Sequence, residues 1–231
     1  MNKNKWIALV LIVSCLPNAH AKYYSQCQQD KFINEFFFKN KKNGVFVDIG
    51  AHDGMSFSNT YFFESELGWH GICIEPLPEI FSQLQKNRKC ICINGCISNK
   101  SGEAQFLKVG GPCEIQMLSG LLEKYDPRHV NRIKRELASC GGMATIISVP
   151  CFTINEILKK YNTFHIDYLS IDTEGGELDI LKSIDFDTFD IKIIDVENNY
   201  NDPEFRNFLE KKGYTYVTTL AWQDEIYAKN V

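Results

Sequence analysis

The sequence is most constrained by one apolar run that ends abruptly in small and polar residues. Val45 to Ile49 (VFVDI) is apolar at nearly every position instead of alternating, which is typical of a strand buried on both faces of a parallel sheet. Gly50 to Gly54 (GAHDG) follows directly, and its glycines allow a tight turn and a close approach of a ligand to the backbone. Ligands of open α/β sheets bind beyond the carboxyl ends of the strands. The stretch therefore predicts a strand followed by a ligand-binding loop.

Strands alternate with helices along most of the remaining chain. This alternation predicts an α/β protein, with a Rossmann-like, doubly wound and mostly parallel sheet that carries helices on both faces. The chain ends on two strands, which suggests an antiparallel hairpin at one edge. The expected strands are 45–49, 71–76, 89–98, 103–109, 166–172, 191–197 and a pair within 214–230, and the expected helices are 23–40, 54–68, 78–88, 127–138, 154–161, 176–184 and 203–213.

Local signals fix some of these helix ends. Thr153 and Glu156 form a capping box that opens one helix. Asp202 is expected as the N-cap of another helix, with Pro203 at its first position. Gly68 is expected to stop the helix that precedes it.

Residues 110–150 break the alternation. The segment is bounded by glycine pairs and contains a charged, weakly amphipathic helix, so it is expected to be an insertion that serves as a lid or binding loop. Its basic residues are compatible with an acidic substrate or with a solvated helix face, and the sequence favours the second reading. The polar residues expected to shape specificity are Tyr125, Arg128, His129, Arg132 and Arg135.

The first 21 residues have the pattern of a secretory signal. Two lysines precede a short apolar run, and Ala19-His20-Ala21 predicts cleavage after Ala21. The run is too short to span a bilayer, which takes about 20 apolar residues. An alternative is a lipoprotein box that ends at Cys15. We therefore expect export, to a periplasm or to the outside, of one domain over residues 22–231.

Eight cysteines follow the signal, and an oxidising compartment would permit disulfides among them. Cys73, Cys90 and Cys92 lie in apolar runs and are expected to be buried thiols. Cys113 and Cys140 flank the irregular segment and are the pair we expect to be bonded. No C-x-x-C pair occurs in the sequence, which argues against a structural zinc site.

Charge and hydropathy exclude some classes of partner. The formal net charge is −4, and no lysine or arginine cluster is dense. We therefore expect no nucleic-acid partner and no transmembrane span.

Polar residues gather at the carboxyl ends of the expected strands. Such residues follow five strands and would meet at one edge of the sheet. They are Asp48 to Gly54 after the first strand, Glu75 after the second, Asn94 to Cys96 after the third, Asp172 to Glu174 after the fourth, and Asp195, Glu197 and Asn198 at the fifth.

The kind of ligand follows from the charges in the first loop. Asp48 and Asp53 would repel a pyrophosphate, and they suit a cationic ligand with an amino-acid portion. Glu75 lies where a carboxylate can accept both hydroxyls of a ribose. Together these acids favour S-adenosylmethionine over NAD. A glycine turn with solvated acids is the alternative.

Three motifs in the chain resemble those of the FkbM-type methyltransferase family, a family of class I S-adenosylmethionine-dependent enzymes. They are FVDIGAHDG, GICIEPLPE and LSIDTEGGELDIL, and the combination of the first with the third is the specific signal. The resemblance covers roughly residues 25–230. It implies a seven-stranded sheet whose last strand is antiparallel.

The resemblance also implies roles for individual residues. Asp48, Gly50, Ala51 and Gly54 would bind the methionine end of the cofactor, and His52 and Asp53 occupy variable positions of the same loop. Glu75 would hold the ribose, and Asn94 to Cys96 lie where the adenine would be, which makes Cys96 a candidate contact. Asp172 and Glu174 match the motif beside the substrate, as does Glu177, which helix capping explains almost as well.

Transfer of a methyl group to a hydroxyl needs a base, and the candidates are His52, Asp172 and Glu174. Asp172, Glu197 and Asn198 also resemble the set that binds magnesium in catechol-type O-methyltransferases, and hard oxygen ligands suit that ion. The alternative for these three residues is a hydrogen-bonded loop.

The expected function is therefore O-methylation, by S-adenosylmethionine, of a hydroxyl on a glycan or small metabolite. Export is difficult to reconcile with a cytoplasmic cofactor. For this reason a non-catalytic binding or interaction protein on a methyltransferase fold remains the alternative.

Overall fold

The structure is a computed structural model that describes residues 22–113 and 115–230. The expected signal segment 1–21, with Cys15, lies outside the described residues. Within the described ranges no helix is both long and apolar enough to cross a membrane.

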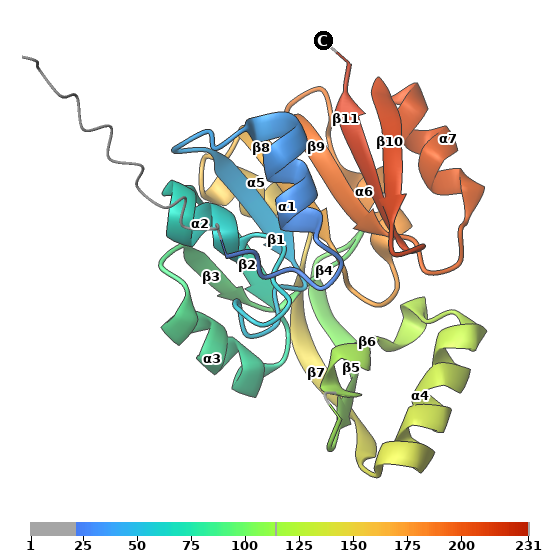
Figure 1. The fold of residues 1–231 in the computed structure, drawn as a ribbon. Coiled ribbons are helices and arrows are strands. Elements are labelled where there is room, and N and C mark those ends of the chain that lie inside the picture. The colour runs from blue at the N-terminus through green and yellow to red at the C-terminus, as the bar shows by residue number, and fades with distance from the viewer. Residues whose placement is uncertain (1–21, 114, 231) are drawn as a thin grey trace, which may run out of the picture.

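A seven-stranded sheet forms the body of the molecule (Figure 1). Its strand order is β10-β11-β9-β8-β1-β2-β3. The strands are β1 (Val45–Ile49), β2 (His70–Glu75), β3 (Ile91–Asn94), β8 (His165–Ile171), β9 (Asp190–Glu197), β10 (Tyr214–Leu220) and β11 (Asp224–Lys229).

The pairing of these strands confirms the predicted fold class. β1 is parallel to β2 and β8, and β9 is parallel to β8. The last strand, β11, is antiparallel to both of its neighbours, β9 and β10. The terminal hairpin therefore does not simply extend the edge, because β11 inserts between β9 and β10 and leaves β10 outermost.

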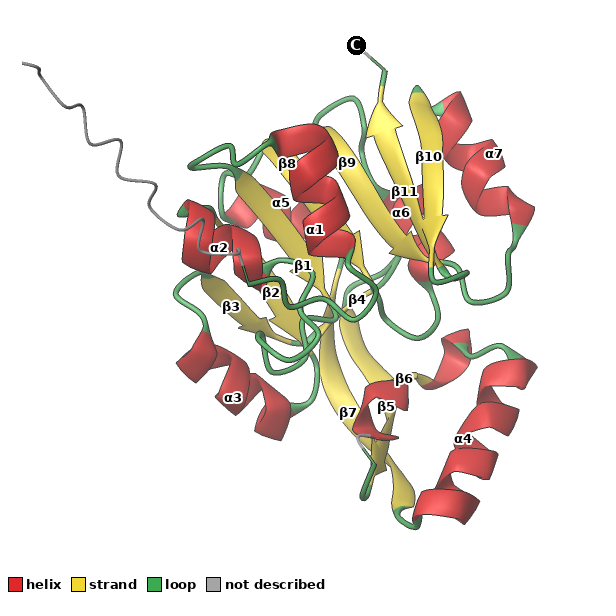
Figure 2. Ribbon diagram, in the orientation of Figure 1, coloured by secondary structure: helices red, strands yellow, loops and turns green. Residues whose placement is uncertain are grey.

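Helices cover both faces of this sheet (Figure 2). Successive strand residues point to opposite faces, so Phe46 packs in one core cluster and Val47 in another. The first cluster includes side chains of α1 (Gln29–Ile33), α2 (Tyr61–Leu67) and α3 (Pro78–Asn87). The second includes side chains of α5 (Ile154–Lys160), α6 (Glu177–Ser183) and α7 (Pro203–Lys211).

The helix-end signals are confirmed. Thr153 and Glu156 form the reciprocal capping box of α5. The Asp202 side chain accepts a hydrogen bond from the backbone N–H of Glu204, and Pro203 begins α7. Gly68 ends α2 in the left-handed conformation, with φ of 67°.

Two predicted helices are shorter than expected. The leading helix begins at Gln29, because the carboxylate of Asp30 accepts hydrogen bonds from the backbone of Tyr24 and Ser25 and holds that segment outside the helix. It continues as a π-helix, Asn34–Phe38, in which Phe36 is 60% exposed. The helix expected from residue 54 begins only at Tyr61.

A second, four-stranded sheet extends below the first in Figure 1, with order β4-β7-β5-β6. With α4 it forms what we call the arm, residues 96–152. Its elements are β4 (Cys96–Ile97), β5 (Gly102–Gly110), the 3-10 helix η2 (Ile115–Leu118), β6 (Gly120–Leu121), the 3-10 helix η3 (Leu122–Lys124), α4 (Pro127–Cys140) and β7 (Met143–Phe152).

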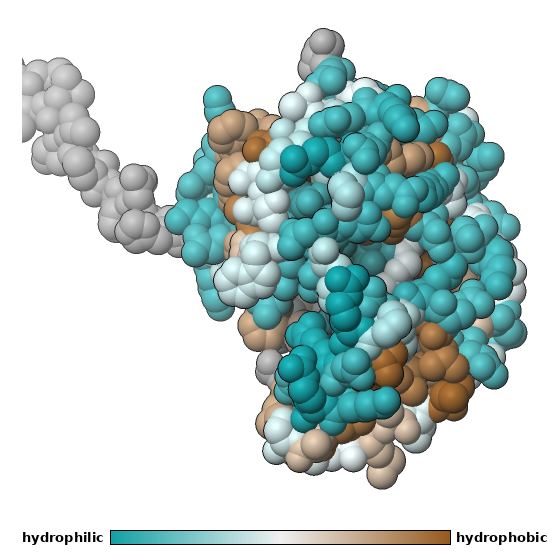
Figure 3. All heavy atoms as spheres, turned by 90° about the vertical axis from the view of Figure 1, so that its right-hand side faces the viewer, coloured by the Kyte–Doolittle hydropathy of each residue, from teal (hydrophilic) through white to brown (hydrophobic). Residues whose placement is uncertain are grey.

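The arm corrects two predictions. The strand expected over residues 89–98 is divided, with β3 in the main sheet and β4 in the arm. Residues 143–150, expected to belong to an irregular insertion, form most of β7, which pairs with the whole of β5. Figure 3 shows the face on the right-hand side of Figure 1, where hydrophobic residues gather in the lower part, at the height of the arm.

The described cysteines are all free thiols. The expected bond between Cys113 and Cys140 is therefore not formed, but the two thiols are hydrogen-bond neighbours. Cys73 is buried, as predicted, and its sulfur lies 3.5 Å from that of Cys90. Cys90 and Cys92 are only half-buried.

Candidate active site

A cavity of about 480 Å³ lies where the carboxyl ends of the main-sheet strands face the arm. The first loop contributes Gly50 and His52, β2 contributes Glu75, and the residues after β8 contribute Asp172 and Glu174. Segments distant in sequence thus meet at one edge of the sheet, as the strand-end pattern predicted.

The carboxylate of Glu75 forms one end of the cavity. Its side chain is buried, with 6% of the residue exposed. One oxygen accepts the backbone N–H of His52 at 3.1 Å and the other accepts that of Leu77 at 2.8 Å. Burial raises the pKa of Glu75 to about 7, although both N–H groups favour the charged form. The carboxylate is therefore fixed in place and keeps lone pairs for a ligand.

The first loop divides the predicted cofactor residues into three groups. Gly50 and His52 line the main cavity. Asp48 and Ala51 border a smaller adjoining cavity, together with Gly50, His52 and Asp172. Asp53 and Gly54 border neither of these two cavities.

Asp53, Gly54 and Asp48 each have a role within the loop itself. The Asp53 carboxylate accepts the backbone N–H groups of Met55 and Ser56 at 2.9 and 2.7 Å, so it closes a turn instead of facing the cavity. Gly54 packs against α3, where an added Cβ would lie 2.5 Å from a methyl group of Leu84. Asp48 accepts the hydroxyl of Thr60 at 2.6 Å. The structure thus gives these residues roles in building the loop that the spacing alone did not distinguish from ligand contact.

Gly50 lets the first loop lie against the end of β8. Its φ is +90°, and a Cβ there would come within 1.7 Å of the backbone oxygen of Asp172. Any side chain at this position would push the two strand ends apart. Glycine at position 50 therefore holds Asp172 next to the first loop.

On the side of the expected adenine, Gly95, Cys96 and Ile97 line the cavity. Cys96 thus lies at the cavity wall. Asn94 does not line it, and its amide donates to the backbone oxygens of Glu75 and Pro76 at 2.9 and 3.1 Å. Asn94 therefore stabilises the backbone of Glu75 and Pro76 and does not contact the cavity.

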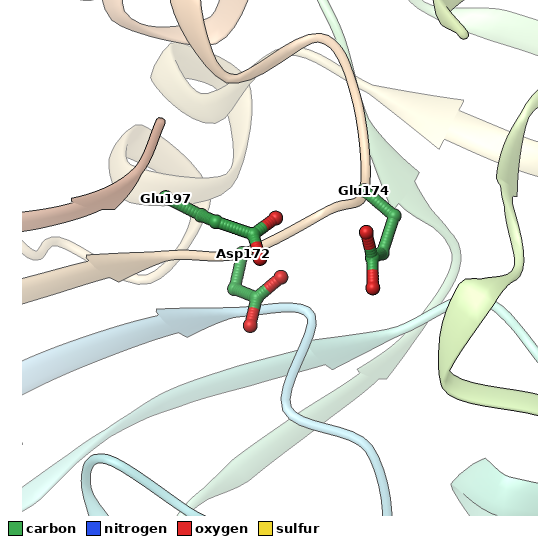
Figure 4. A group of neighbouring side chains, drawn as sticks. All are labelled: Asp172, Glu174 and Glu197. Carbon is green, nitrogen blue, oxygen red and sulfur yellow. The ribbon is translucent and has the colours of Figure 1, made fainter. Parts of the chain in front are cut away.

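The opposite end of the cavity is acidic. Asp172, Glu174 and Glu197 each direct a carboxylate oxygen into one group whose atoms all lie within 4.8 Å of one another (Figure 4). Burial, and then the charge of Asp224, raises the pKa of Asp172 to about 7. Burial also raises the pKa of Glu174 and Glu197, and Asp172 adds to both shifts.

Asn198, expected beside Asp172 and Glu197, does not take part. Its amide nitrogen donates to the Asp202 backbone at 3.0 Å and to Glu225 at 3.2 Å. Its amide oxygen accepts the N–H of Asp202 at 2.8 Å. The two bonds to Asp202 hold the loop before α7, and the third ties that loop to β11. Glu174 takes the place in the acidic group that was expected for Asn198.

Glu174 links the acidic group to the arm. Its Oε2 lies 3.3 Å from Nδ1 of His129 and 3.9 Å from the guanidinium of Arg132, both on α4. His129 is buried and stacks on Tyr125, with ring centroids 4.9 Å apart. Two of the basic residues predicted to shape specificity therefore touch the site, while Arg128 stacks on Tyr200.

Several cavity residues were not predicted from the sequence. Trp222 and Gln223 reach the cavity from the turn between β10 and β11, and Phe57 reaches it from the loop before α2. The 3-10 helix η2 adds Ile115 and neighbouring residues. His52, Phe57, Cys113, Glu174 and Trp222 all line the cavity with positive φ. Backbone conformations of this kind collect at functional sites, but no sequence pattern marks them outside glycine.

Comparison with protein families identifies one domain. The methyltransferase FkbM domain matches residues 48–216 of the chain. The matched range begins at the acid of β1 and ends in β10, so it contains both ends of the cavity. Comparison with curated proteins gives no match.

Solved structures of methyltransferases are similar at low identity. The methyltransferase FkbM from Methylobacillus flagellatus is 11% identical with a TM-score of 0.48, covering 82% of this chain and 44% of that one. The N-terminal domain of human METTL16 in complex with SAH is 14% identical with a TM-score of 0.42, covering 87% and 66%. Precorrin-6y C5,15-methyltransferase from Geobacter metallireducens is 12% identical with a TM-score of 0.40, covering 82% of both chains. The chain thus spans less than half of the first of these proteins.

Proposed function

The chain belongs to the FkbM methyltransferase family, and from this premise we propose that it uses S-adenosylmethionine to methylate a hydroxyl of a glycan or small metabolite. One observation carries the proposal above the others. The carboxylate of Glu75 is buried, held by two backbone N–H groups and open to a cavity of about 480 Å³. A fixed acceptor of this kind, at the end of the second strand, suits the two hydroxyls of a ribose.

The cavity also suits the rest of the cofactor. Gly50 leaves the backbone of the first loop open beside Asp172, so an amino-acid portion can lie against it. Gly95, Cys96 and Ile97 provide a wall for the adenine ring. The acids at the far end disfavour the phosphates of a dinucleotide.

When bound, the cofactor would supply a methyl group on a positive sulfur: the S–CH₃ bond breaks, the O–CH₃ bond forms, and the electron pair stays on sulfur. The residues of the chain then have two tasks, to hold the acceptor in line and to take up its hydroxyl proton. The surrounding protein places the pKa of Asp172 at about 7, which is close to the value that suits a general base at neutral pH. We propose Asp172 as the base, with Glu174 and His52 lining the same space.

The acceptor would enter between the first loop and the arm. Phe57 and Trp222 lie at the cavity with 41% and 80% exposure, and exposed aromatic faces suit the apolar faces of sugar or polyketide-like rings. Arg132 reaches the cavity from α4. These residues support a small acceptor or a glycan over a bulky partner.

We further propose that the protein is exported, as residues 1–21 suggest, and acts where the cofactor is available to it. A non-catalytic binding protein is the second candidate, because a fold can be retained after its catalytic activity is lost. The acidic group and the held Glu75 favour retained cofactor binding, since a scaffold needs neither. Cell fractionation with an antibody would test export, and a protein found only in the cytoplasm would contradict it.

Calorimetric titration of the purified protein with S-adenosylhomocysteine tests the main proposal. We expect binding in the micromolar range, with NAD giving no heat in the same cell. Binding by NAD and not by S-adenosylhomocysteine would reject the cofactor assignment. Binding of S-adenosylhomocysteine without turnover in a broad acceptor screen would favour the binding-protein alternative.

A further inference from the structure

The acidic end of the cavity holds more negative charge than its protein neighbours balance. Asp172 follows β8, Glu174 lies two residues further, and Glu197 ends β9, and their carboxylates converge in Figure 4. Among the described residues, no lysine or arginine forms an ion pair with Asp172 or Glu197, and Arg132 approaches Glu174 only to 3.9 Å. Like charges this close disfavour each other strongly in a buried site.

Glu197 gives a second, independent observation. The residue is 5% exposed, so it is more than nine-tenths buried. One of its oxygens accepts a long bond of 3.4 Å from Gln223, and the other, Oε2, has no hydrogen-bond donor within the described residues. A buried carboxylate oxygen without a donor is costly unless something else fills that place.

We propose that Asp172, Glu174 and Glu197 bind one hard divalent cation at the acceptor end of the cavity. Three oxygen ligands from carboxylates are the set that magnesium, manganese and calcium prefer. The oxygens lie within 4.8 Å of one another, and two ligands on opposite sides of a calcium ion are about 4.6–5.2 Å apart, against about 4.2 Å for magnesium. The spacing is therefore close to what one ion needs, and a small inward shift of the side chains would bring the three oxygens to a calcium ion, with a larger shift for magnesium.

The contact between Glu174 and His129 gives the site a link to the arm. Nε2 of His129 lies 3.2 Å from the backbone oxygen of Leu118, so in the neutral ring it donates there and leaves Nδ1 bare. Nδ1 lies 3.3 Å from Oε2 of Glu174, and that oxygen accepts no hydrogen bond from the described residues.

The functional meaning of this site depends on the proposed methyl transfer. The ligand oxygens face the cavity in which the acceptor would lie, so open positions on the cation could hold the acceptor hydroxyl and lower its pKa. An organic ammonium group is the competing occupant of the same acids. It carries one charge against three carboxylates, which is why we favour the divalent ion.

Titration with manganese, followed by electron paramagnetic resonance of the free ion, tests the proposal without any acceptor. We expect the protein to remove one Mn²⁺ per chain from solution, and both Mg²⁺ and Ca²⁺ to release it. The change Glu197→Gln keeps the shape and removes the charge, and should weaken binding at least about tenfold. Glu210→Gln, on the exposed side of α7, should bind as the unchanged protein does.

Equal Mn²⁺ affinity in the protein and in Glu197→Gln would overturn the proposal, as would no binding at millimolar Mn²⁺. Asp172→Asn provides a second variant should Glu197→Gln fail to fold, and must show the same loss. Calorimetry with S-adenosylhomocysteine on the same samples separates the two hypotheses. Cofactor binding without Mn²⁺ binding rejects only the cation site, and Mn²⁺ binding without cofactor binding rejects only the proposed function.

Discussion

The carboxylates at the two ends of the cavity differ in the hydrogen-bond donors that they receive. At one end a single acid, Glu75, accepts a backbone N–H on each oxygen. At the other end three acids crowd together, and Oε2 of Glu197 accepts no hydrogen bond from the described residues. Both ends lie at strand ends of one sheet, so the difference comes from the loops. The loop after β1 turns its N–H groups toward the acid of β2, whereas the loop after β8 turns its N–H groups toward Glu177.

Glu177 accepts the backbone donors of the loop after β8. One of its oxygens accepts the backbone N–H groups of Thr173 and Gly175, at 3.0 and 2.8 Å. The donors that could have stabilised the charge of Asp172 or Glu174 are therefore used to shape the loop. One end of the cavity is completed by the protein, and the other needs a positive partner. The Glu75 end is thus suited to neutral hydroxyls and the acidic end to a cation or a proton.

The largest expected effect is on the acidic end. Asp172→Asn should lower the rate of methyl transfer at least about 100-fold, because the amide can neither accept the hydroxyl proton nor carry charge. The affinity for S-adenosylhomocysteine should change by less than about threefold, since Glu75 is untouched. The measurement is release of S-adenosylhomocysteine with an acceptor found by screening. An unchanged rate would assign the proton transfer to another residue, with His52 the next candidate.

A smaller effect is expected when the carboxylate at the other end of the cavity is removed. Glu75→Ala should weaken the binding of S-adenosylhomocysteine about 30-fold or more, because it removes a charged acceptor and leaves the N–H groups of His52 and Leu77 without it. Calorimetry measures the loss, and Glu66→Ala, at an exposed position of α2, is the control. If the two variants bind alike, Glu75 is a loop residue and the two ends of the cavity do not differ as argued.

The sequence predicted which acids belong to the site, but it did not predict how they are oriented and hydrogen-bonded. Glu75, Asp172, Glu174 and Glu197 could be named because carboxyl ends of parallel strands share an edge. Which of these acids receives N–H donors depends on loop backbone conformations, such as φ of 58° at Glu174, that a side-chain pattern does not encode. Asn198 was misplaced for the same reason, since the turn before α7 decides where its amide points.

The arm was predicted less well than the main sheet. Most residues of β7 are exposed although its sequence, MATIISVPCF, is largely apolar, so the strand does not have the burial that its composition suggests. Its pairing with β5 joins Gly110 to Met143 across the whole of α4, and such long-range pairing leaves no local signal. The contact of His129 with Glu174 depends on that pairing, because β5 and β7 position α4.

The Glu75 end of the cavity should also respond to pH, by a smaller factor. The folded protein raises the pKa of Glu75 to about 7, through burial first and then the charges of Glu79 and Asp48. The carboxylate fraction then rises from about one tenth at pH 6 to about nine tenths at pH 8. Affinity for S-adenosylhomocysteine should therefore increase up to about tenfold over this range, because the charged form accepts the ribose hydroxyls more strongly.

The contribution of Glu75 to the stability of the free protein should decrease as pH rises. A carboxyl whose pKa is raised by folding binds a proton more readily in the folded state, so its contribution to stability falls as pH rises from the ordinary value of 4.5 to about 7. Glu75→Gln removes both trends and is the control for the other acids that titrate nearby. A pH profile of affinity that is the same in Glu75→Gln would place the titrating group at the acidic end.

The smallest expected effect is on melting temperature, and its sign distinguishes the two ends most directly. In chelator, Glu197→Gln should melt about 2–4 °C higher, since removing one of three crowded carboxylates gains about 1 kcal/mol in a chain of this size. Glu75→Gln should melt lower at pH 6, where the carboxyl of the unchanged protein is mostly protonated, because an amide nitrogen cannot accept and one of the N–H groups of His52 and Leu77 is left unpaired. Saturating Mn²⁺ should then raise the melting point of the unchanged protein by more than that of Glu197→Gln. If both variants shift in the same direction in chelator, the acids at the two ends are equally well compensated, and the acidic end has no need of a cation.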